Sequence, residues 1–104
     1  MTVRMTPEDV LTRIDAAIEA RRAERTALLA DLVRVDSTLG REQAAIDRME
    51  EAYREAGLSV DAWPLRYDAL RGEPGFSPVD WAEAGRGTVV GTHHVTAVEG
   101  RSLI

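Results

Sequence analysis

The spacing of the apolar residues changes once along this chain, at Gly57, and this change limits the possible folds more than any other feature. Before Gly57, apolar side chains recur every three to four residues, which is the spacing of one face of an α-helix. After it, short runs rich in β-branched residues alternate with turn residues, which is typical of β-strands. The sequence therefore predicts a chain in which helices come first and strands follow.

The first helix is expected over about residues 7–35. Thr6 can cap its N-terminus, and Pro7 suits the first helical position. Its apolar residues form two groups separated by a polar middle. Arg21 and Arg25 would lie on the seam of any coiled coil drawn through both groups, which argues against a coiled coil.

A second helix is expected over about residues 41–56. Ser37 or Thr38, in the turn before it, is the candidate cap. Gly57 is the natural left-handed residue after its C-terminus. Its apolar stripe comprises Ala45, Ile46, Met49, Ala52, Tyr53 and Ala56, and Glu50 pairs with Arg54 on the opposite side.

Three strands are expected after Gly57, over about residues 58–65, 87–95 and 101–104, and Pro64 marks the end of the first. A long irregular segment separates the first two strands. The expected fold class is α/β, locally α+β, in one domain spanning 1–104.

Composition excludes several function classes. The chain has no cysteine and no lysine, which excludes a thiol nucleophile, a cysteine-bound zinc ion and a phosphate-loop lysine. The net charge of −5 argues against nucleic acid as a partner. No secretory signal or membrane-spanning run is visible, so a cytoplasmic protein of bacterial type is expected.

No catalytic, cofactor-binding or metal-binding residue is predicted. His93 and His94 are adjacent on an expected strand, so they would point to opposite faces and form no ligand pair. A structural role is preferred for both, with a weak adventitious metal contact as the alternative.

The charged clusters are interpreted as solvated, salt-bridged surfaces. The candidates are Glu50, Glu51 and Glu55 on the second helix, and Arg21, Arg22 and Arg25 interleaved with Glu19 and Glu24 on the first. An acid–base pair and an anion site, respectively, are the functional alternatives. Trp63, Phe76 and Trp81 are interpreted as residues that pack the long loop onto the domain.

Five segments, taken in order, resemble one enzyme family. They are LLADLVRVDS at 28–37 followed by Gly40-Arg41-Glu42, GLSVD at 57–61, PGFSPV at 74–79, VVGTH at 89–93 and GRSLI at 100–104. Together they resemble the opening of the di-zinc aminoacylase-type metallopeptidases, which include acetylornithine deacetylase and succinyl-diaminopimelate desuccinylase. Asp36 stands where the family has proline, and Thr88 where it has asparagine.

The resemblance implies the first part of a catalytic domain with a mixed central sheet. The full family enzyme is a zinc- or cobalt-dependent hydrolase that removes the acyl group from N-acyl amino acids. In that family the metal-binding His-x-Asp-x-Val-Pro strand follows the GRSLI segment, so the chain is expected to be an N-terminal fragment that is inactive alone and binds no metal. Its expected partners are a second copy of itself or the remainder of the enzyme. The alternative is a small stand-alone α+β protein–protein interaction module without enzymatic activity.

Overall fold

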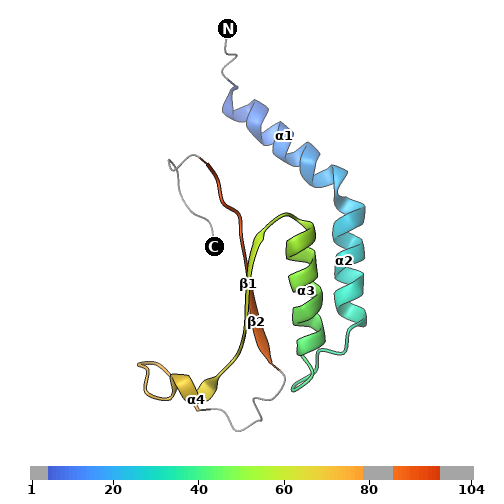
Figure 1. Cartoon of the computed structure of the whole chain (residues 1–104). Helices are drawn as coiled ribbons and strands as arrows, with labels where there is room; N and C mark the ends of the chain where they lie inside the picture. Colours follow the sequence, from blue (N-terminus) through green and yellow to red (C-terminus); the bar gives the residue numbers. More distant parts are fainter. Residues whose placement is uncertain (1–4, 79–85, 97–104) are drawn as a thin grey trace. The chain divides into compact units, whose positions relative to one another are not determined.

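The computed structural model describes residues 5–78 and 86–96 (Figure 1). The chain forms two compact units, Met1–Arg34 and Val35–Ile104. The described elements are helices and a two-stranded antiparallel sheet, so the general expectation of a mixed α/β chain is confirmed.

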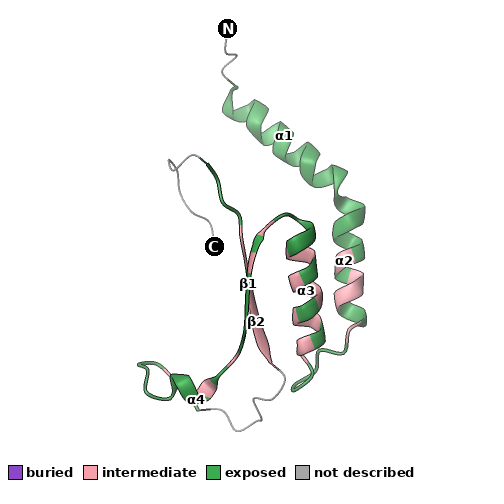
Figure 2. Ribbon diagram, in the orientation of Figure 1, coloured by how far each residue is buried: buried purple, intermediate pink, exposed green. Residues whose placement is uncertain are grey.

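The first unit contains two consecutive helices, α1 (Pro7–Ala20) and α2 (Arg22–Arg34). A capping box starts α1: the Asp9 backbone N–H donates to Thr6 Oγ1 at 3.1 Å, and the Thr6 backbone N–H donates to Asp9 Oδ2 at 3.0 Å. The whole of α1 is exposed to solvent (Figure 2).

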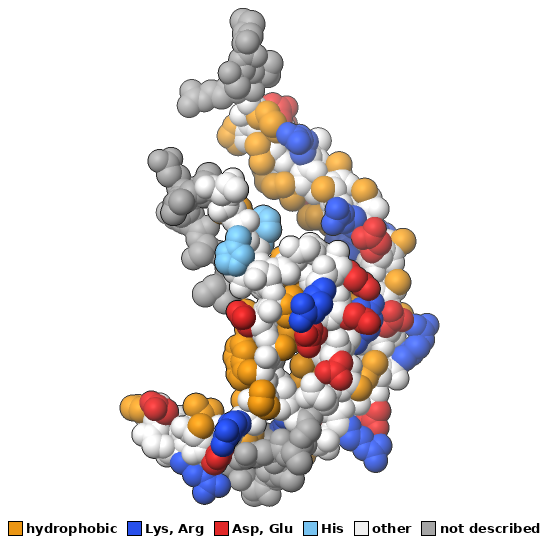
Figure 3. Space-filling model, in the orientation of Figure 1, with side chains coloured by type: hydrophobic (Ala, Val, Ile, Leu, Met, Phe, Trp, Pro, Cys, Tyr) orange, Lys and Arg blue, Asp and Glu red, His pale blue; other side chains and the backbone are white. Residues whose placement is uncertain are grey.

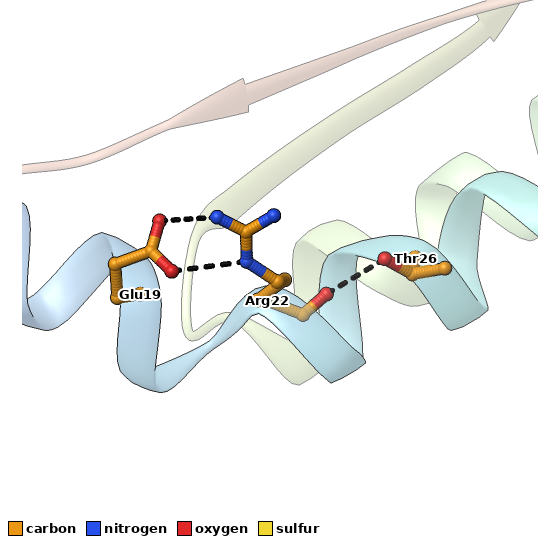
Figure 4. Close-up of polar contacts among 3 residues, drawn as sticks. All are labelled: Glu19, Arg22 and Thr26. Atoms are coloured by element: carbon orange, nitrogen blue, oxygen red, sulfur yellow. Dashed lines mark hydrogen bonds and ion pairs between the residues drawn. The ribbon is translucent and has the colours of Figure 1, made fainter.

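The single helix expected over about 7–35 is instead divided at Arg21. The Arg21 backbone N–H reaches back to the Ile18 carbonyl at 3.3 Å, one residue short of the α-helical partner, and this tightens the last turn of α1. Below the junction, the Thr26 hydroxyl donates to the Arg22 carbonyl at 2.9 Å (Figure 4). Such back-bonding bends helices. No large apolar residue lies between Ile18 and Leu28, so the apolar spacing does not indicate whether the helix continues through this site.

The second unit begins with α3 (Gln43–Glu55), which lies within the helix expected over 41–56. Gly57 follows its C-terminus with φ of 77°, as the sequence predicts. The Leu58 N–H donates to the Tyr53 carbonyl at 3.0 Å and the Gly57 N–H to the Arg54 carbonyl at 2.9 Å. This pair of bonds is a Schellman motif, and it turns the chain directly from helix into strand.

The sheet comprises β1 (Ser59–Pro64) and β2 (Gly87–Thr92), paired in antiparallel register from Ser59 opposite Thr92 to Pro64 opposite Gly87. The third expected strand, 101–104, lies outside the described residues. Among the described residues between the two strands lies a short helix that the sequence did not predict, α4 (Tyr67–Leu70). The ring of Tyr67 lies 6.5 Å from that of Phe76, so Phe76 packs within the loop, and among the described residues no ring contact joins it to the sheet or α3. Trp63 is exposed on β1, and Trp81 lies outside the described residues.

Helix α3 packs on one face of the sheet, and the two together form the small core of the second unit. No described residue is fully buried. The apolar stripe of α3 is half-buried at Ala45, Ile46, Met49, Ala52 and Tyr53, whereas Ala56 is exposed. The core is therefore a single layer between one helix and one face of a narrow sheet.

Candidate functional site

Helix α3 packs closely against β2 at Gly91. A Cβ atom added to Gly91 would lie 2.8 Å from Leu58 Cδ1 and 2.9 Å from Tyr53 Cγ. Such distances are shorter than any ordinary carbon contact. The Tyr53 ring thus rests on the strand backbone, and only glycine at this position permits that approach.

A second close approach lies at the other end of α3. A Cβ atom added to Gly87 would lie 3.1 Å from Gln43 Oε1. Gln43 and Tyr53 are ten residues apart on a helix that rises about 1.5 Å per residue, so they are separated by about 15 Å along α3. Gly87 and Gly91 are four residues apart on a strand that rises about 3.4 Å per residue, so they are separated by about 14 Å along β2. Because the two spans match, α3 runs along β2 with a glycine beneath each end.

An ion pair reinforces the Gly87 end. Arg86 Nη2 lies 3.0 Å from Glu42 Oε1, and the Arg86 side chain is only 9% exposed. Burial of the Glu42 carboxylate acts to raise its pKa. Hydrogen bonds from the backbone N–H groups of Glu42 and Gly40, together with the Arg86 charge, outweigh that effect and leave the pKa below its usual value. Sequence reasoning missed this pair because no local pattern links the two positions.

The two histidines do not lie on a strand. The strand expected over 87–95 ends at Thr92, opposite Ser59, because the chain before Ser59 turns into the Schellman motif and offers no further strand for pairing. His93 and His94 follow the strand, and both are exposed. The expectation that they occupy opposite faces of the sheet is therefore wrong.

The acidic surface of α3 is salt-bridged. Glu50 Oε1 lies 2.6 Å from Arg54 Nη2, which is the expected pair. Arg48 Nη1 lies 3.5 Å from Glu51 Oε2 and 3.8 Å from Glu55 Oε2. Each pair joins a half-buried side chain to an exposed one. Pairs that are open to solvent contribute little to stability, and nothing in their geometry indicates acid–base chemistry.

The arginine cluster of the first unit is also paired in part. Arg22 donates to both carboxylate oxygens of Glu19, at 2.7 and 2.9 Å, across the junction between α1 and α2 (Figure 4). This bidentate geometry is the strongest form of such a pair. Arg21 and Arg25 make no ion pair within residues 5–78 and 86–96.

The turn before α3 differs from its expected capping role. The Thr38 hydroxyl donates to Asp36 Oδ1 at 2.8 Å instead of capping α3, and Ser37 makes no capping bond either, since the N-cap position is Glu42. Asp36 also accepts from Arg41 at 2.7 Å. Bonds from Arg41 and then from Thr38 hold the pKa of the Asp36 carboxyl below its usual value.

Apolar residues on α1 and on the sheet form two groups without cover among the described residues of their own units. On α1 the exposed residues are Val10, Leu11, Ile14 and Ile18. On the sheet, Trp63 and Val90 lie on the face opposite α3, at 47% and 43% exposure. Figure 3 shows hydrophobic side chains along α1 and beside the strands. These surfaces, and no polar cluster, are the candidate functional site.

The family resemblance implies a metal centre for the full family enzyme but no metal ligand in this chain. No three His, Asp or Glu side chains gather within 5–78 and 86–96 in a way that would hold a metal ion. None of the helices in this part of the chain is both long and apolar enough to cross a membrane.

Comparison with known proteins identifies no relative of this chain. No protein-family model, no curated protein and no solved structure matches the chain. The local structure and the ordered motifs are therefore the only guides to function.

Proposed function

We propose that these residues correspond to the N-terminal part of the catalytic domain of a zinc-dependent amidohydrolase similar to acetylornithine deacetylase, an enzyme class that hydrolyses N-acyl amino acids. Their role is to build the scaffold beside the catalytic centre. They supply none of its metal ligands or catalytic groups, so they are expected to be inactive when isolated.

The order and placement of the family-like segments support this proposal. The GLSV segment at 57–60 lies at the Schellman motif and the start of β1, which fits the helix-to-strand step of the family motif. The VVGT segment at 89–92 lies in β2, directly paired with β1, which fits the family's strand. The Tyr53–Gly91 contact explains why the VVGT segment has glycine at position 91.

A chimaera tests the scaffold role. Residues 14–104 replace the corresponding segment of an acetylornithine deacetylase, and zinc-dependent hydrolysis of the N-acetylated substrate is measured. Retained hydrolysis is expected, and the same chimaera carrying Gly91→Val is expected to lose it together with its fold. A chimaera that folds and binds zinc without any hydrolysis would contradict the proposal.

The gene itself offers a second test. The nucleotides after the Ile104 codon are expected to encode His-x-Asp-x-Val-Pro, in frame or frame-shifted. An unrelated continuation would count against the enzyme family. Elemental analysis of the 104-residue chain is expected to find no stoichiometric zinc.

The alternative is a stand-alone interaction module without enzymatic activity, and the exposed apolar residues of α1 and the sheet favour it. It predicts an inactive chimaera and an unrelated gene continuation. It also predicts that a charged residue in place of Trp63 abolishes partner binding without unfolding the chain.

A further inference from the structure

Helix α1 presents an apolar stripe that its own unit does not cover. Val10, Ile14 and Ile18 recur every four residues and, with Leu11, lie on one face, at 41–62% exposure. Within the described residues, the unit Met1–Arg34 consists of α1 and α2, which follow one another along the chain. The stripe therefore needs a surface from outside this unit.

The charges at the two ends of α1 are opposite. Glu8 and Asp9 lie in its first turn, and Arg21 and Arg22 follow its last residue. Asp9 is engaged by Thr6 and Arg22 by Glu19. Glu8 and Arg21 make no ion pair within the part of the chain that the structure describes. Each end of the stripe thus carries one exposed charge available for an external partner, acidic at the start and basic at the end.

We propose that α1 is a dimerisation helix that pairs with α1 of a second copy of this chain in antiparallel orientation, centred on Ile14. In such a pair Ile14 lies opposite its own copy and Val10 lies level with Ile18, so the stripe is complementary to itself. Residue 21 lies level with residue 7, one position from Glu8 of the second copy. The available charges at both ends of the pair then meet with opposite signs.

A parallel pair would bring like charges together. Glu8 would lie beside Glu8, and Arg21 beside Arg21, and like charges at such positions destabilise a helix pair. The charge distribution along α1 therefore selects the antiparallel orientation, which the apolar stripe alone does not.

The interface between two α1 helices would be small, so the dimer is expected to be weak. The 14 residues of α1 extend about 21 Å, and an interface of that length falls in the small, weak class. Dimers are expected only at chain concentrations on the order of 10 µM or above. This inference does not depend on the proposed enzyme relationship, because it uses only the residues of the first unit.

Sedimentation velocity of the full chain over a concentration series tests the pairing. We expect a shift from monomer to dimer that Ile14→Glu abolishes. Ala16→Glu, on the opposite face of α1, is the matched control and should leave the shift unchanged. A monomer at every concentration, or a dimer that Ile14→Glu does not weaken, overturns the proposal, since association would then be absent or would use another surface.

Charge reversal and cross-linking test the orientation. Glu8→Arg and Arg21→Glu are each expected to raise the dissociation constant several-fold, and the double variant to restore it. The chain has no cysteine, so single cysteines report cleanly. Ile14→Cys should form a disulfide dimer on oxidation, and Val10→Cys should cross-link to Ile18→Cys but not to itself. Self-cross-linking of Val10→Cys would overturn the antiparallel arrangement.

Discussion

Gly91 is the position where a single added methyl group tests the packing of α3 on the sheet. In Gly91→Ala the new Cβ would lie 2.8 Å from Leu58 Cδ1 and 2.9 and 3.1 Å from two ring atoms of Tyr53. The Leu58 methyl is the end of a flexible side chain and can move. The Tyr53 Cγ atom is joined directly to Cβ, so the ring can yield only if its χ1 leaves the preferred rotamer or α3 shifts.

The expected cost follows from two opposing effects. Forcing an extra methyl group into a packed contact costs about 1–3 kcal/mol. Replacing glycine by alanine lowers the entropy of the unfolded chain, which offsets about 0.4–1 kcal/mol of that cost. The net loss is about 1–2 kcal/mol, a large share of the stability of a domain whose core is a single layer.

Urea unfolding followed by circular dichroism measures this loss, at a chain concentration low enough to keep the protein monomeric. Gly72→Ala is the matched control, because a Cβ atom at Gly72 meets nothing within 4 Å. The control is expected to be neutral or slightly stabilising. In a Tyr53→Ala background the cost of Gly91→Ala should shrink, since the ring is gone. An unfolding midpoint for Gly91→Ala equal to that of the wild type, or the same cost in both backgrounds, would refute the reasoning.

Three further predictions use local features of the chain. Gly57→Ala should lower the unfolding free energy by about 1 kcal/mol, measured by urea unfolding, because alanine is strained at a φ of 77°. Thr6→Ala should reduce the helical ellipticity of α1 through loss of the capping bond to Asp9, at a cost of about 1 kcal/mol to the helix. For Asp36, whose pKa is lowered, the stabilisation is present above its unfolded-state value of 3.8 and is lost as pH falls through the lower folded-state value. The urea midpoints of wild type and Asp36→Asn should therefore differ near neutral pH, and the gap should shrink as the pH falls below 3.8; a gap that does not change with pH would contradict this linkage.

The parts of the fold that the sequence predicted depend on neighbouring residues. The apolar stripe of α3 repeats at helical spacing, and Gly57 ends it because the chain must adopt positive φ there. The β-branched residues of 87–92 favour a strand irrespective of its partner. Such signals extend over a few residues, so they are visible without knowledge of the tertiary structure.

The features that the sequence did not predict depend on contacts between distant positions or on competition between bonds. Arg86 and Glu42 meet only after β2 has paired with β1 and α3 has packed on both. Thr38 had two available partners, the start of α3 and Asp36, and the nearer carboxylate accepts its hydroxyl. The polar stretch around Arg21 carries no apolar signal for or against a break, and the local bonds of Arg21 and Thr26 bend the helix there.

The candidate site consists of apolar surface, and sequence and structure each contribute one part of that conclusion. Periodicity predicted which side chains share a face, and the structure adds that Val10, Ile14 and Ile18 have no cover within their unit. Because exposed apolar stripes are costly in water, such a face requires a second surface, whichever protein supplies it. The charges of Glu8 and Arg21 then decide between possible surfaces, since only a partner with the opposite order of charges satisfies both ends. A second α1 in antiparallel orientation meets that requirement using residues the chain already contains.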